Sequence, residues 1–255
     1  MREERRTAKG RWPSLEKLRD RVADEQGTVR KEAPFRVALL YPSPYHTAMS
    51  SLGYQVIYRV LNDLPGVAAD RAVLPDEGDE PPELLTLERE RPVGEYPIIA
   101  ASVAYELEIP GLLECLRLSG LPPLAAERAP GAPLVVAGGP LTFSNPVPLA
   151  PFCDVILMGE AEELVVELVA RFQDTPDRDA LLEALAGRPG FYVPRRHGDT
   201  PPPVAKVDDD RLPARSVRNI DDSSVCGVMM TERAGRRSSS TLATGGGVSP
   251  WRRGT

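Results

Sequence analysis

The chain has 255 residues, 42% of them hydrophobic, and a formal net charge of −6 at pH 7. This is an ordinary composition for a soluble globular protein, and the negative charge argues against nucleic acid or an anionic membrane as partner. No apolar run approaches the roughly 20 residues that span a bilayer, and no hydrophobic segment follows the basic N-terminus as in a secretory signal. We therefore expect a cytoplasmic protein without a membrane partner.

Residues 1–33 are highly charged and predict a peripheral arm with one short helix. Ser14 can cap a helix that carries Leu15, Leu18 and Val22 on one face. We expect this arm to lie outside the core.

Residues 34–195 alternate between apolar strands and segments with helical spacing, which predicts an α/β domain. The predicted strands cover residues 35–41, 69–74, 97–104, 134–137, 153–158 and 191–193. The predicted helices lie around residues 52–61, 83–89, 109–120, 159–172 and 180–186. Such alternation builds a mostly parallel sheet with helices on both faces. Right-handed crossovers favour an open, doubly wound sheet with the strand order 2-1-3-4-5.

Ligands of doubly wound sheets bind beyond the carboxyl ends of the strands, so the residues at that edge are the candidate binding residues. They are Pro42, Ser43, His46, Ser50, Ser102, Tyr105, Gly138, Gly139, Thr142, Asn145, Gly159 and Glu160. The adjacent glycines at 138–139 permit either close approach by a ligand or only a tight turn. The polar side chains that follow them can bond a ligand or the backbone of their own loop.

These residues do not compose a recognisable catalytic site. The first loop, Y-P-S-P-Y-H-T-A-M-S-S-L-G, has no glycine before Gly53 and cannot supply the G-x-G-x-x-G of a dinucleotide site. His46 is either a ligand for a metal or cofactor or a loop histidine bonded to backbone or solvent. The three cysteines (Cys115, Cys153 and Cys226) lie far apart, which excludes a disulfide framework and a compact Cys/His metal site. The residues alone predict a binding domain, with no catalytic residue and no metal cluster.

The composition changes again past residue 195. Residues 196–225 are rich in proline and charge and predict a linker. Residues 226–255 are rich in arginine, serine and glycine without an apolar period, which predicts a disordered tail. We expect the five arginines of this tail to be solvated.

Four segments of the chain, taken together and in this order, form a pattern that is specific enough to indicate a family. They are Y-P-S-P-Y-H-T-A-M-S-S-L-G-Y-Q-V-I-Y-R-V-L-N, S-V-A-Y-E-L-E-I-P-G-L-L-E-C-L-R-L-S-G-L, V-V-A-G-G-P-L-T-F-S-N-P-V-P-L-A-P-F and V-I-L-M-G-E-A-E-E-L. From about Phe35 to Phe172 the chain resembles the N-terminal cobalamin-binding-like domain of a family of bacterial radical SAM proteins. The resemblance implies a flavodoxin-like domain whose loops face cobalamin, another small-molecule cofactor, or a second, catalytic domain. For the full-length family it also implies a 4Fe–4S cluster and S-adenosylmethionine.

The chain departs from the family pattern in the first loop. Cobalamin domains that displace the lower base of the cofactor use D-x-H-x-x-G there. His46 matches the histidine, but Pro44 and Met49 stand in place of the aspartate and the glycine. Because the aspartate normally orients the imidazole, His46 is a candidate cobalt ligand without its usual partner. The domain can equally bind the corrin without histidine or be a relic of the cobalamin fold.

The chain also departs from the family pattern in its cysteines. Radical SAM chemistry needs C-x-x-x-C-x-x-C, because three closely spaced thiolates hold the iron–sulfur cluster. Only the isolated Cys226 lies in the region where this motif is expected. We therefore expect the chain to be truncated or frame-shifted near Cys226, and sequencing the encoding DNA tests this.

The resemblance predicts an accessory N-terminal domain of a radical SAM protein, inactive alone, that holds cobalamin or docks the catalytic domain. One alternative is a stand-alone module that binds a small ligand or a partner protein without chemistry. Another is a small-molecule enzyme with His46 as general base, for which the sequence shows no orienting partner.

Overall fold

The computed structural model of the protein describes residues 13–79, 81–159, 161–175, 177–205 and 218–219. The candidate residue Glu160, most of the predicted linker and the whole predicted tail lie outside the described residues. Within the described part of the chain, no helix is long and apolar enough to cross a membrane.

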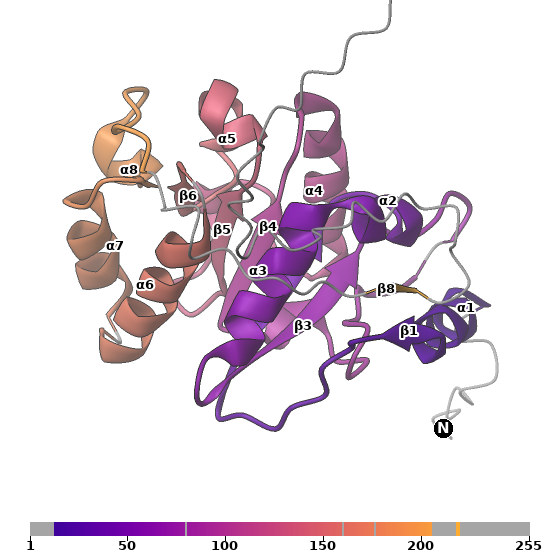
Figure 1. Ribbon diagram of the computed structural model, residues 1–255. Helices are drawn as coiled ribbons and strands as arrows, with labels where there is room; N and C mark the ends of the chain where they lie inside the picture. Colours follow the sequence, from indigo (N-terminus) through magenta and orange to yellow (C-terminus); the bar gives the residue numbers. More distant parts are fainter. Residues whose placement is uncertain (1–12, 80, 160, 176, 206–217, 220–255) are drawn as a thin grey trace, which may run out of the picture.

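A six-stranded sheet forms the centre of the protein (Figure 1). Its strands in chain order are β2 (Phe35–Tyr41), β3 (Val67–Val73), β4 (Ile98–Ser102), β5 (Leu134–Gly138), β6 (Val155–Leu157) and β7 (Phe191–Tyr192). Their order across the sheet is β3-β2-β4-β5-β6-β7, and only β7 runs antiparallel to its neighbour. The five parallel strands have the predicted order 2-1-3-4-5, so the switch point lies between β2 and β4.

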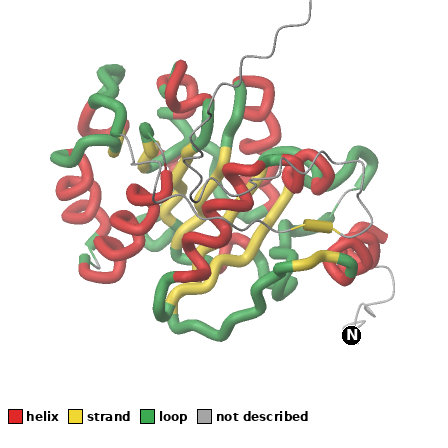
Figure 2. Tube along the Cα trace, in the orientation of Figure 1, coloured by secondary structure: helices red, strands yellow, loops and turns green. Residues whose placement is uncertain are grey.

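Helices cover both faces of this sheet (Figure 2). The α-helices of the described residues are α1 (Pro13–Ala23), α2 (Tyr45–Ser50), α3 (Leu52–Asp63), α4 (Ile109–Leu118), α5 (Leu141–Ser144), α6 (Ala161–Asp174), α7 (Arg178–Ala186) and α8 (Pro194–His197). Along β2, Val37 and Leu39 join the core formed with α3, α6 and α7, whereas Ala38 and Leu40 join the core formed with α4. This alternation buries every strand on both faces, which explains the unbroken apolar runs of the sequence. The predicted doubly wound, flavodoxin-like fold is confirmed.

The outer edge of β3 is covered by side chains of this same domain. The Asn62 side chain accepts from the Ala69 N–H at 3.1 Å and donates to the Ala69 carbonyl at 3.2 Å. The Arg71 N–H donates to a Glu88 carboxylate oxygen at 2.6 Å, and the Leu87 N–H donates to the Arg71 carbonyl at 2.7 Å. The strand therefore does not present these backbone groups to another chain.

The prediction of a helix around residues 83–89 is wrong. This segment forms turns, with an isolated bridge between Leu85 and Pro92. Its backbone and its Glu88 carboxylate bond the edge of β3, and these long-range bonds outweigh the local helical spacing of the apolar residues.

The N-terminal segment is attached to the core more firmly than the sequence predicted. Val22 of α1 is 5% exposed and packs in the core with α3. Glu25 opens the short strand β1 (Glu25–Gln26), which pairs with β8 (Arg218–Asn219). Its fully buried carboxylate forms an ion pair with Arg71 at 2.5 Å and accepts from the Tyr45 hydroxyl at 2.6 Å.

Candidate functional site

The parallel strands end at one edge of the sheet, and the loops that follow them carry the predicted site residues that the structure describes. The register pairs Ser102 at the end of β4 with Gly138 at the end of β5. The first loop and α2 follow β2 at the same edge, and Gly159 follows β6. The predicted site residues that the structure describes therefore lie along one edge of the sheet.

The first loop turns its polar side chains in two directions. Pro42 and Ser43 are buried, and the Ser43 hydroxyl donates to Glu108 at 3.0 Å. His46 and Ser50 lie exposed on α2, and the Ser50 hydroxyl donates to the His46 carbonyl at 2.9 Å. Of this loop, only α2 presents polar side chains outward.

Glu108 is a buried polar residue at this edge that the sequence did not predict. It ends the 3-10 turn η3 (Glu106–Glu108), and it is 2% exposed. Its carboxylate accepts from the Ser43 hydroxyl and, at 2.6 Å, from the Ala104 N–H. Because Ser43 follows β2 and Ala104 follows β4, this carboxylate joins the two sides of the switch point.

The Glu108 carboxylate also affects the pKa of its neighbour Tyr41. Burial and, second to it, the nearby Glu108 carboxylate raise the pKa of Tyr41 to about 12 from its ordinary value of 10.0. Both causes disfavour the tyrosinate, because a second negative charge would lie in a site withdrawn from water.

Close backbone contacts seal the same edge. Gly111 of α4 lies so near the first loop that a Cβ there would stand 2.2 Å from the Pro42 carbonyl oxygen. Gly139 has φ +107°, and a Cβ there would stand 2.7 Å from the Val103 carbonyl oxygen. Of the two uses predicted for the glycines, Gly139 serves the tight turn and a close approach by the chain itself.

The remaining predicted residues differ in what they offer to a ligand. Thr142 is fully buried, and its hydroxyl lies 2.9 Å and 2.8 Å from the carbonyl oxygens of Gly139 and Leu157, so it bonds backbone. A Cβ on Gly159 would stand 2.0 Å from the Ala205 carbonyl oxygen. Tyr105 and Asn145 are exposed, and Ser102 and Gly138 are half-buried.

These contacts decide how the edge fits a corrin cofactor. A cofactor tail inserted at the switch point needs open space between the loops after β2 and β4. Glu108 and the contact of Gly111 with Pro42 occupy that space. Met49, which stands where the family pattern has glycine, is 6% exposed, and its sulfur lies 3.3 Å from an Arg71 nitrogen. The residues present do not fit an inserted cofactor tail.

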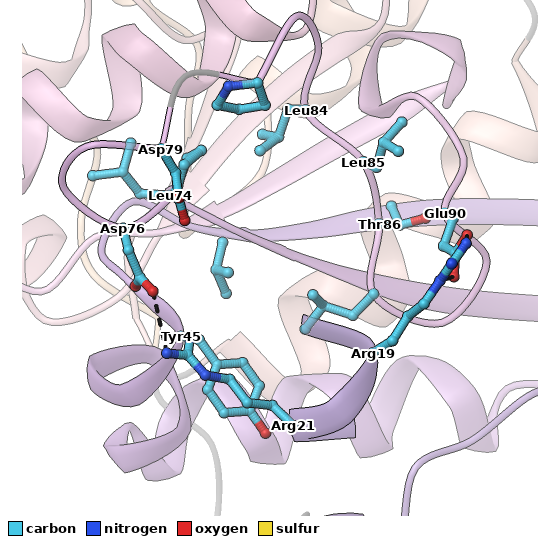
Figure 3. A pocket seen from close by; sticks show the side chains of 14 residues that line it. Arg19, Arg21, Tyr45, Leu74, Asp76, Asp79, Leu84, Leu85, Thr86 and Glu90 are labelled. Atoms are coloured by element: carbon cyan, nitrogen blue, oxygen red, sulfur yellow. Dashed lines mark hydrogen bonds and ion pairs between the residues drawn. The ribbon is translucent and has the colours of Figure 1, made fainter. Parts of the chain in front are cut away.

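A pocket lies away from these residues, between α1, the start of α2 and the chain after β3 (Figure 3). None of the predicted site residues lines it. Leucines form much of its wall, and two ion pairs cross it, Arg19 with Glu90 and Arg21 with Asp76, the latter at 3.1 Å. The Arg21 guanidinium also lies 5.4 Å from the centre of the Tyr45 ring. These partly exposed ion pairs link α1 to the chain after β3.

Fold and edge together define a class of protein, a doubly wound α/β domain in which the loops at the carboxyl edge of the sheet bond to one another. Within the described residues, no group of three His, Cys, Asp or Glu side chains is placed to hold a metal ion. In comparison with known families, residues 53–194 match the family described as radical SAM proteins, N-terminal. The match covers more than half of the chain, which therefore belongs to this family of N-terminal regions. No curated protein and no solved structure matches the chain.

Proposed function

We propose that this domain is a non-catalytic docking module of a radical SAM protein, and that its sheet edge packs against the catalytic region. The observation that carries the proposal is the sealed switch point, where Glu108 binds Ser43 and Ala104. Loops joined in this way are pre-organised, which lowers the entropy cost of binding a protein partner. In this family the iron–sulfur cluster and S-adenosylmethionine belong to the catalytic region.

The experiment is a binding measurement between this chain and the catalytic region of a radical SAM protein that carries the same kind of N-terminal region. The two are produced separately and mixed in an isothermal titration calorimeter. We expect a one-to-one complex, and a radical SAM catalytic region from another family serves as control. Absence of any complex at the highest attainable concentration contradicts the proposal.

A second candidate function is to hold a corrin that lies flat on the outside of the edge. The exposed position of His46 on α2 favours this candidate. Titration of the chain with cobalamin, followed by absorbance, tests it. Binding that is lost in His46→Ala supports ligation by the histidine, and binding unchanged in that variant rules such ligation out.

A further inference from the structure

We infer that the docking surface is an apolar patch of Tyr105, Leu107 and Phe143, and that the partner's face is apolar with a basic rim. This inference rests on the proposed function and deepens it, because it names the residues that make the contact and the chemistry that they select.

The exposed large apolar side chains of the described residues are concentrated at the sheet edge. Tyr105, Leu107 and Phe143 are 45%, 82% and 50% exposed, and Val204 beside the end of β6 is 40% exposed. The remaining one, Leu124, lies in the connection from α4 to β5, at the opposite edge. Grouped exposed apolar side chains mark interaction surfaces, whereas single ones are ordinary on any protein.

The two loops that carry the patch are adjacent. Tyr105 and Leu107 follow β4, and Phe143 follows β5 on the next strand of the sheet. The Val103 N–H donates to the Gly138 carbonyl at 2.8 Å, and the Leu141 N–H donates to the Val103 carbonyl at 3.2 Å. These bonds join the start of the loop after β4 to the loop after β5.

Buried neighbours hold the backbone next to Leu107 and Phe143 in place. Leu107 lies between the exposed Glu106 and the buried Glu108, and the Glu108 carboxylate anchors the turn through two hydrogen bonds. Phe143 follows Leu141 and Thr142, which are 1% and 0% exposed. Because the backbone on both loops is already fixed, the patch loses little conformational entropy on binding. Such pre-organised aromatic and aliphatic groups are typical energetic centres of interfaces.

The charges around the patch indicate the sign of the charge on the partner's surface. Exposed Glu106 lies within the patch, and Glu162 and Glu163 open α6 at the end of the neighbouring strand β6. The loop residues 103–108 and 139–146 contain no lysine or arginine. An apolar centre with an acidic rim selects a partner with an apolar centre and lysine or arginine around it.

The chain passes this edge at residue 205, where the Ala205 N–H donates to the Met158 carbonyl at 2.8 Å beside the end of β6. Residues 218–219 (β8) pair with β1, whose Glu25 binds Arg71 on β3 at the other side of the sheet. The apolar centre and the charges of the patch, rather than the path of the chain, therefore identify the partner's face.

The experiment compares three variants with the unaltered chain in titrations against the catalytic region. We expect Leu107→Asp and Phe143→Asp each to weaken binding by about 30-fold or more, as for residues at an interface centre. Leu124→Asp introduces the same change at the opposite edge and should alter the dissociation constant by less than about 2-fold. Circular dichroism and urea unfolding of each variant verify that the fold is retained.

The outcomes separate the two proposals. A complex that forms normally with Leu107→Asp and Phe143→Asp overturns the patch and leaves docking intact. Absence of a complex with the unaltered chain overturns both. A dimer of the chain itself that Leu107→Asp dissolves assigns the patch to self-association and overturns the partner named here. If Glu106→Lys binds the catalytic region as tightly as the unaltered chain does, the assignment of a basic rim to the partner is wrong.

Discussion

Replacing Glu108 with alanine removes the carboxylate that joins the loops after β2 and β4. The side chain is 2% exposed and accepts two hydrogen bonds, from the Ser43 hydroxyl at 3.0 Å and from the Ala104 N–H at 2.6 Å. Alanine leaves both donors without this acceptor in a site that is withdrawn from water. The neighbouring Glu106 is exposed, so Glu106→Ala is a matched control on the same turn.

The expected loss follows from the two bonds. A hydrogen bond to a charged group contributes about 1.5–3 kcal/mol, so two of them amount to about 3–6 kcal/mol. Removal of the buried charge offsets part of this, because the carboxylate was taken out of water at a cost. We therefore expect Glu108→Ala to lower the free energy of unfolding by about 3 kcal/mol, a large part of the 5–15 kcal/mol of a typical domain. Glu108→Gln keeps one carbonyl acceptor and should lose about half as much.

Urea unfolding followed by circular dichroism measures these losses, with Glu106→Ala expected within about 0.5 kcal/mol of the unaltered chain. Alkaline titration of tyrosine absorbance gives a second readout. Loss of the Glu108 charge should lower the pKa of Tyr41 from about 12 toward 10.0 in Glu108→Gln. Equal unfolding energies for Glu106→Ala and Glu108→Ala, with an unchanged Tyr41 titration, would refute the assigned role of Glu108.

Three further predictions concern the core and the edge. Gly139→Ala should cost about 2–6 kcal/mol, because a side chain at φ +107° is strained and meets Val103, whereas Gly53→Ala, in open space, should stay within about 1 kcal/mol in the same urea assay. Glu25→Ala should cost about 3 kcal/mol in thermal or urea unfolding, because it strips one carboxylate from a buried arginine. Stability should fall as the pH rises from 10 to about 12: the folded-state pKa of Tyr41 is raised, so the folded chain holds its proton more tightly than the unfolded chain until both are ionised. A flat unfolding energy over that pH range contradicts this last prediction.

The sheet was predictable from the sequence because its cause is local. Each parallel strand is buried on both faces, so the chain must supply an apolar run of strand length, as residues 35–41 and 134–138 do. The helices between the strands and the right-handed crossovers then leave few topologies, and the order 2-1-3-4-5 follows. The position of the predicted site residues at one edge follows from that topology.

The polar contacts were not predictable, because their partners are distant in the sequence. Glu25 and Glu88 both bind Arg71, which is 46 and 17 residues away from them. Glu106 and Glu108 flank the same leucine, and no local pattern tells which of them turns inward toward Ser43. The false helix around residues 83–89 has the same origin, since a bond to the edge of β3 decides its backbone.

The interior position of β2 in the sheet decides how long a fragment must be to fold. The matched residues 53–194 omit β2, although β2 pairs on one side with β3 and on the other with β4. A fragment cut at the family boundary would separate β3 from β4 and expose two strand edges to aggregation. The residues that match the family, 53–194, are thus fewer than the residues that build the sheet. Expressed fragments and domain transplants must begin upstream of Glu25 to carry β2 together with the carboxylate that pairs with Arg71.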